Sequence, residues 1–177
     1  LTVDLTYDGE TNLPVDMGSY AVTGTVNEAN WQGSATGTLT IGKAPATVAL
    51  GDLSQVYDGS AKSATATTDP AGLAVDFTYD GSATAPSNAG SYAVTGTVND
   101  ANYQGTATGT LAIAKASATV ALGDLSQVYN GSARSATATT DPAGLAVELT
   151  YDGSTTAPSN AGSYVVTGMV NEANYEG

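Results

Sequence analysis

The chain has 177 residues, 41% of them hydrophobic, and carries 4 basic against 17 acidic residues, so its net charge is −13. Such an acidic surface opposes binding to nucleic-acid phosphates and to anionic membranes, and no apolar run approaches the roughly 20 residues of a membrane-spanning helix. The absence of Cys excludes disulfide scaffolds, thiol catalysis and Cys-ligated zinc.

One stretch, residues 90–99, organises the chain. Tyr92, Val94, Gly96 and Val98 alternate there with small or polar residues, which is the period of a half-buried strand. The same stretch recurs at a spacing of 72 residues on either side, so the chain is a tandem array. We place the divisions at 1–43 (the C-terminal part of a first repeat), 44–115 (a complete repeat) and 116–177 (a repeat without its last strand). Because both ends fall inside a repeat, we expect the chain to be a piece of a longer one.

The sequence of the first repeat predicts three strands, over residues 1–7, 20–27 and 35–41. The turn Asp8-Gly9 closes the first strand, and a polar loop over 28–33 separates the central strand from the last. Asp and Gly are typical of such turns because both tolerate a positive φ.

The middle repeat adds an N-terminal half. Its predicted strands cover 47–50, 63–68, 73–79, 92–98 and 106–113, with a β-turn at Asp69-Pro70-Ala71-Gly72. We expect Val56, between the first two of these strands, to lie in the core of the repeat. Short alternating strands separated by turns indicate an all-β fold of tandem small Ig-like β-sandwich modules. The third repeat follows this pattern but lacks the strand equivalent to 106–113, which would leave an unpaired edge.

Comparison of the repeats separates turn residues from candidate contact residues. Asp58 becomes Asn130 in the third repeat, which argues for a turn role and against a required carboxylate. The loop over 10–17 differs most between repeats, and it carries the apolar residues Leu13, Val15 and Met17. They either cover a local gap in the sandwich or contact a partner or the adjacent module.

The residue types do not favour catalysis. His and Cys are absent, and the carboxylates are spread over turns and outer strand faces, so we predict no enzyme and no catalytic residue. Calcium is the one cofactor that the oxygen donors suggest. Its candidate ligands are Asp52, Asp69, Asp80, Asn99, Asp100 and Asn102. No calcium-loop spacing is present, so we interpret them as turn residues bonded to their own backbone, and predict no metal site and no bound cofactor.

Several motifs recur in order at fixed spacing. They are Tyr-Asp-Gly-Ser after a strand, Asn-Ala-Gly-Ser-Tyr-Ala-Val-Thr-Gly-Thr-Val, Asn-Asp-Ala-Asn-Tyr-Gln-Gly and Gly-Thr-Leu-Ala-Ile-Ala-Lys-Ala. In these the whole chain resembles tandem MBG domains, the mostly bacterial Ig-like repeats of large surface and secreted proteins. The resemblance implies an Ig-like sandwich used as a stalk or adhesive module, and it implies no catalytic residues.

We therefore expect a structural or adhesive repeat, a stalk or fibre module, of a bacterial cell-surface or secreted protein, with neighbouring repeats as its partners. One alternative is a carbohydrate- or protein-binding module that meets a host or cell-surface protein or glycan through its loops. Its contact residues would be Leu13, Val15, Met17, Trp31, Tyr103 and Tyr175, since aromatic rings beside Asn and Gln can stack on sugars. Another alternative is a subunit that self-associates by strand exchange. We expect no nucleic acid and no membrane insertion.

Overall fold

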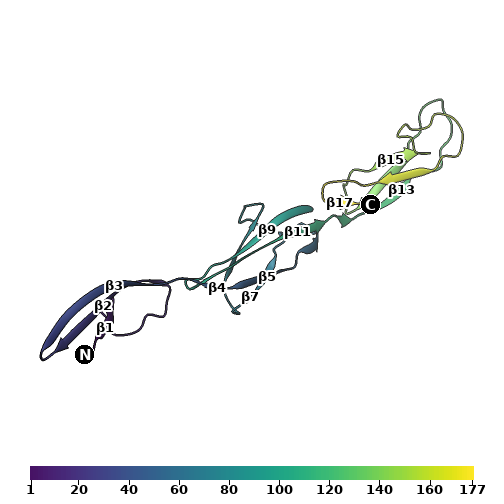
Figure 1. The fold of residues 1–177 in the computed structure, drawn as a ribbon. Helices are drawn as coiled ribbons and strands as arrows, with labels where there is room; N and C mark the ends of the chain where they lie inside the picture. Colours follow the sequence, from purple (N-terminus) through teal and green to yellow (C-terminus); the bar gives the residue numbers. More distant parts are fainter. The chain divides into compact units, whose positions relative to one another are not determined.

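The computed structural model describes residues 1–177, and it contains strands, turns and loops but no helix (Figure 1). The predicted all-β class is therefore confirmed. The chain divides into two compact units. The first unit comprises Leu1–Gly51, Thr65–Thr78 and Thr95–Thr108, and the second comprises Asp52–Ala64, Tyr79–Val94 and Gly109–Gly177.

The strands are short except in the hairpins of the first two repeats. They are β1 (Asp4–Tyr7), β2 (Gly18–Glu28), β3 (Trp31–Ile41), β4 (Ala44–Pro45), β5 (Thr47–Gly51), β6 (Ser54–Val56), β7 (Thr65–Asp69), β8 (Val75–Tyr79), β9 (Gly90–Val98), β10 (Tyr103–Gln104), β11 (Thr106–Ala114), β12 (Ala116–Ser117), β13 (Thr119–Gly123), β14 (Thr137–Asp141), β15 (Glu148–Tyr151), β16 (Val166–Met169) and β17 (Tyr175–Glu176).

In the first repeat, β1, β2 and β3 form an antiparallel three-stranded sheet in that order (Figure 1). The β2–β3 register begins at Gly18↔Ile41 and continues to Glu28↔Trp31. The predicted polar loop over 28–33 is therefore wrong for this repeat, because the hairpin closes with only two residues between its strands. β3 includes Gln32 and Gly33, whose polar or small side chains are compatible with a strand.

The middle repeat pairs its strands in two sheets. β5 pairs with β7, while β6, β11, β9 and β8 lie in that order in a four-stranded sheet. A Cβ placed on Gly96 of β9 would lie 3.0 Å from Leu50 of β5 and 3.2 Å from Val75 of β8. Leu50 therefore packs directly against the backbone of β9, so glycine at position 96 allows this close approach.

The central strand has the predicted alternation. Val94, Gly96 and Val98 are buried and Ala93 and Thr97 are exposed, which confirms the period-two pattern. Leu111 on β11 is the largest fully buried side chain of the middle repeat, and Ile113 on the same strand is 3% exposed. One expected core residue is wrong: Val56 is 56% exposed, because its side chain lies on the outer face of β6.

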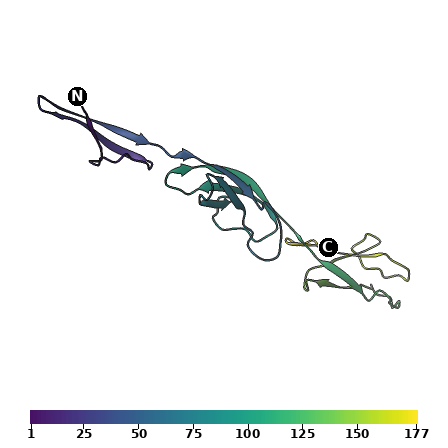
Figure 2. The same ribbon diagram turned by 90° about the horizontal axis from the view of Figure 1, so that it is seen from below.

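The third repeat keeps the same local pairs. β13 pairs with β14 and β15 pairs with β16, both antiparallel (green to yellow in Figure 2). Gly168 corresponds to Gly96, and a Cβ on it would lie 3.0 Å from Val120 and 3.1 Å from Leu122 of β13. The same close packing therefore recurs in the second unit.

A buried tyrosine hydroxyl fixes a loop in two repeats. The hydroxyl oxygen of Tyr79 accepts a 2.9 Å hydrogen bond from the backbone N–H of Ala64, and Tyr151 accepts one of the same length from Ala136. Tyr79 and Tyr151 are 5% and 6% exposed. Because a buried N–H without a partner is costly, each tyrosine satisfies a donor that no strand pairing reaches.

Candidate functional site

The most regular polar contacts in the chain join one repeat to the next. The linker strand β4 pairs in parallel with β10, at Tyr103↔Ala44 and Gln104↔Pro45, within the first unit. In the second unit β12 pairs with β17 in the same way. We call each such region a repeat joint: the first joint is formed around β4 and β10, and the second around β12 and β17.

Backbone hydrogen bonds hold each linker. In the first joint Ala44 N donates to the carbonyl oxygen of Asn102 at 2.8 Å, and Ala46 N donates to that of Gln104 at 2.7 Å. In the second joint Ala116 and Ala118 donate to Asn174 and Glu176 at 2.9 and 2.7 Å. These short linkers are therefore tied to the repeat that they enter.

An asparagine side chain closes each joint. In the first joint, Asn102 Oδ1 accepts from the N–H of Met17 at 2.7 Å, and Asn102 Nδ2 donates to Asp16 Oδ1 at 2.7 Å. In the second joint, Asn174 accepts from the N–H of Ala89 at 2.8 Å and donates to Asn88 Oδ1 at 3.1 Å. Each asparagine thus uses donor and acceptor together on the loop of the preceding repeat.

A glycine lies directly under each linker. A Cβ placed on Gly105 would lie 2.2 Å from the carbonyl oxygen of Ala46, and one on Gly177 would lie 2.1 Å from that of Ala118. Gly33 occupies the same position in the first repeat, where nothing lies within 4 Å. Glycine at 105 and 177 is therefore required by backbone approach at the joint.

Three further side-chain contacts belong to the joints. Lys43 Nζ donates to the carbonyl oxygen of Asp100 at 2.7 Å, and Lys115 Nζ donates to Asn171 Oδ1 at 2.8 Å. In the second unit Tyr57 and Tyr175 meet edge to face, with ring centroids 5.3 Å apart and planes at 81°. Such an arrangement is favourable for aromatic pairs.

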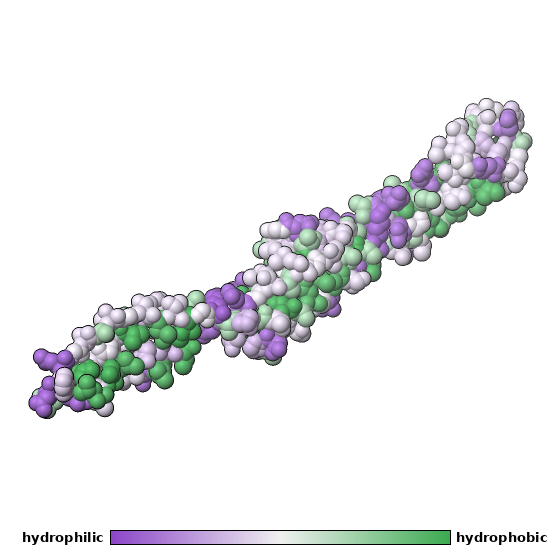
Figure 3. Space-filling view, in the orientation of Figure 1, coloured by the Kyte–Doolittle hydropathy of each residue, from purple (hydrophilic) through white to green (hydrophobic).

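The sequence-predicted contact residues fall into two groups. Leu13, Val15 and Trp31 are exposed at 74%, 85% and 65%, and Met17 is also exposed. Tyr103 and Tyr175 are half-buried, Tyr103 in the first joint and Tyr175 in the second. The backbone of Met17 takes part in the first joint, whereas Leu13 and Val15 are directed to solvent. Figure 3 also shows hydrophobic residues gathered over the sheet of the first repeat, where Leu1, Val3 and Leu5 are exposed.

The candidate calcium ligands bond neighbouring groups of the chain. Asp80 Oδ1 accepts from the N–H of Ala93 at 2.8 Å, and Asp100 Oδ1 accepts from those of Asn102 and Tyr103 at 2.7 and 3.0 Å. Asn99 donates to Asp76 at 2.9 Å. No three His, Cys, Asp or Glu residues are grouped as a metal site would require.

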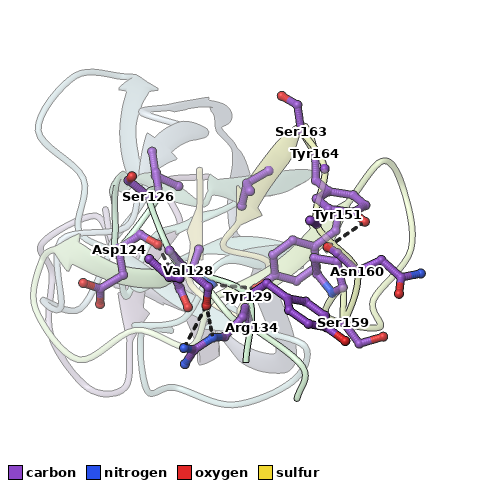
Figure 4. Close-up of a pocket in the computed structure, with 17 residues that line it drawn as sticks. Asp124, Ser126, Val128, Tyr129, Arg134, Tyr151, Ser159, Asn160, Ser163 and Tyr164 are labelled. Atoms are coloured by element: carbon purple, nitrogen blue, oxygen red, sulfur yellow. Dashed lines mark hydrogen bonds between the residues drawn. The ribbon is translucent and has the colours of Figure 1, made fainter. Parts of the chain in front are cut away.

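A pocket of about 420 Å³ lies in the third repeat, within the second unit (Figure 4). Residues 124–129 form one wall, and residues 158–164 with Val166 form the other. Arg134 does not point a free charge into it, because its Nε and Nη2 donate to the carbonyl oxygen of Val128 at 3.2 and 3.0 Å. Three tyrosines, Tyr129, Tyr151 and Tyr164, line the pocket together with polar residues such as Gln127 and Asn160.

Sequence reasoning missed the joint asparagines as contact residues, and it had considered Asn102 only as a calcium ligand. The signal that could have found them was recurrence, because Asn102 and Asn174, like Gly105 and Gly177, are separated by one repeat length. Recurrence alone could not name their partners, since Asp16 and Met17 lie more than eighty residues earlier.

The strands and repeated joints define a tandem all-β repeat protein. The family model of the MBG domain matches three consecutive segments, residues 1–45, 46–117 and 118–177, and so the chain belongs to the MBG domain family. The resemblance expected from the sequence motifs is thereby confirmed, with divisions two residues later than those we placed. No curated protein and no solved structure matches the chain.

None of the elements is a helix of the length and hydrophobicity needed to cross a bilayer.

Proposed function

We propose that this chain is a spacer of a bacterial cell-surface or secreted protein, in which MBG repeats act as a non-enzymatic stalk or fibre module. Each complete repeat is, in this proposal, a small Ig-like sandwich. Packing of Leu50 from the β5–β7 pair against Gly96 of β9 supports two facing sheets, as does the equivalent packing around Gly168.

The observation that carries the proposal is the recurrence of one joint. The linker pairing, the asparagine that grips the preceding loop and the glycine under the linker occur in both joints. A flexible tether would need none of these contacts, because Gly- and Ser-rich segments without pairing suffice for it. Repeats that contact their neighbours through a fixed interface behave instead as a quasi-one-dimensional support.

The extracellular setting rests on the family and on composition. The absence of Cys and the net charge of −13 favour a hydrated surface that repels its neighbours. The proposed partners are the neighbouring repeats, and the role requires neither cofactor nor catalytic centre.

The test measures the distance between two repeats across the first joint. Because the chain has no Cys, Thr38→Cys and Thr67→Cys place two spin labels at exposed strand positions of the first and middle repeats. Pulsed electron–electron double resonance should give a narrow distribution of the distance between the two labels. Adding Asn102→Ala and Gly105→Ala should broaden it, whereas Gly33→Ala should not. A broad distribution in the otherwise unaltered chain would refute the spacer role.

A second candidate is binding through the loops, which the exposure of Leu13, Val15 and Trp31 favours. Exposed apolar and aromatic side chains supply contact area for a protein or glycan. The chain and its Trp31→Ala and Leu13→Ser variants should then differ on a glycan array or against surface proteins. If both variants bind everything that the parent chain binds, these loops are not the contact site.

A further inference from the structure

One loop of the third repeat contains the only asparagine of the chain that is followed by glycine. The loop reads Tyr129-Asn130-Gly131-Ser132, and its counterpart in the middle repeat reads Tyr57-Asp58-Gly59-Ser60. Residues 130–132 are exposed, and residues 58–60 are exposed as well, so this loop lies at the surface in the complete repeat too. The two loops therefore differ only in the amide that replaces a carboxylate.

Neither of the two nitrogens that concern us in this loop is held by the chain. Asn130 Oδ1 accepts a 3.0 Å hydrogen bond from the N–H of Ser132, whereas Asn130 Nδ2 has no partner in the chain. The backbone N–H of Gly131 donates to no group of the chain either. A glycine nitrogen is the least hindered backbone nitrogen, because no Cβ lies beside it. By contrast, Nδ2 of Asn102 and of Asn174 donates across a joint.

We propose that Asn130 is a site of spontaneous deamidation in the folded chain. The backbone nitrogen of Gly131 attacks Cγ of Asn130, so that a new C–N bond forms. The bond from Cγ to Nδ2 breaks, and Nδ2 leaves as ammonia with the proton that Gly131 gives up. Water then opens the five-membered succinimide ring at either of its two carbonyl carbons, and the N–H of Gly131 is restored. The product is aspartate or isoaspartate; water is the only co-reactant, and no group is oxidised or reduced.

The aspartate product gives the third repeat the charge pattern of the middle repeat. There Asp58 accepts hydrogen bonds from Ser60 and from Lys62 Nζ. Arg134 has the place of Lys62 in the third repeat, but it donates to the carbonyl oxygen of Val128. A carboxylate at position 130 offers Arg134 an ionised acceptor, and bonds to such acceptors are the stronger ones. The modification does not depend on the spacer role, because it requires only this loop.

Trypsin isolates the site for measurement. Cleavage after Lys115 and Arg134 releases the peptide 116–134, in which Asn130 is the only asparagine, while the peptide 63–115 carries three others as internal controls. The folded chain of residues 1–177 is incubated at mildly alkaline pH in water enriched in oxygen-18, and it is then digested in ordinary water. We expect the peptide 116–134 to lose its amide and gain one labelled oxygen at least tenfold faster than the peptide 63–115, because only Asn130 precedes glycine.

One variant and one reference state complete the test. Asn130→Gln keeps the amide but would have to close a six-membered ring, so its peptide 116–134 should be labelled at least tenfold more slowly. The urea-unfolded chain serves as the reference for the intrinsic reactivity of the loop, and tyrosine fluorescence checks that the incubated chain stays folded. The proposal is overturned if the peptide 116–134 is labelled no faster than 63–115, if Asn130→Gln is labelled as fast as its parent, or if label enters only the unfolded chain.

Discussion

The Asn102 amide and the Asp16 carboxylate meet at 2.7 Å across the first joint, where the second joint has a 3.1 Å bond between Asn174 and Asn88. The two joints share one geometry but differ in the charge of the acceptor. Hydrogen bonds to an ionised acceptor are shorter and stronger than those between neutral groups. We therefore infer that the first joint is the tighter of the two.

Replacement of Asn102 by Ala should open the first joint selectively. It removes the acceptor of the Met17 N–H and the donor to Asp16, at a cost of about 0.5–1.5 kcal/mol for each bond. Hydrogen exchange of the Met17 amide should accelerate, while that of Ala89 in the second joint should not change. Asn30→Ala is the matched control, since Asn30 has the same position in the first repeat. Unchanged exchange at Met17 would show that Asn102 does not hold the loop.

Replacement of Gly105 by Ala should displace the linker. The new Cβ would lie 2.2 Å from the carbonyl oxygen of Ala46, so the backbone must move, and overpacking of this kind costs about 1–3 kcal/mol. Urea unfolding followed by tyrosine fluorescence measures the loss. Gly33→Ala should be neutral or slightly stabilising, because its Cβ meets nothing within 4 Å. Equal effects of the two substitutions would contradict the assigned role of Gly105.

Replacement of Tyr79 by Phe should destabilise the middle repeat by about 1–3 kcal/mol, because the buried N–H of Ala64 loses its acceptor. The aromatic ring and its packing are retained, so the change isolates the hydroxyl group. Thermal unfolding gives the difference. Tyr7→Phe is the control, since Tyr7 is the equivalent residue of the first repeat and makes no such bond. A Tyr79→Phe variant as stable as its parent would mean that water satisfies the Ala64 amide.

The bond between Asp58 and Lys62 should make stability depend on pH in the acid range. The hydrogen bond from Lys62, followed by those from Ser60, holds the pKa of the Asp58 carboxyl below its ordinary value of 3.8. Because the folded-state pKa is the lower one, this contribution is complete above about pH 4 and is lost as the pH falls below it.

Asp58→Asn should therefore flatten the decline in the free energy of unfolding below about pH 4, measured by urea titration at a series of pH values. The reciprocal variant Asn130→Asp brings a carboxylate to the position four residues before Arg134, and it should steepen that decline. Parallel curves for all three chains would count against the pairing.

The parts of the fold that follow from local patterns were predictable. The alternation of Val94, Gly96 and Val98 is a property of consecutive residues, and it placed β9 and its buried face correctly. Val56 was misplaced because a three-residue strand offers too short a pattern to decide which face is buried. The loop expected around Asn30 became a hairpin because strand pairing overrides the preference of polar residues for loops.

The joints were not predictable from spacing alone. The partners of Asn102 are set by tertiary approach, and an asparagine in a polar loop equally suits solvent, a turn or a cation.

The joint has a consequence for how such a gene can change. Its asparagine, its glycine and the position of the receiving loop recur at one fixed interval, so loss or duplication of whole repeats by recombination between near-identical stretches would again place each asparagine beside a receiving loop. The number of repeats could then vary while every repeat joint kept its contacts. The length of the array could therefore change between generations without any new interface between repeats.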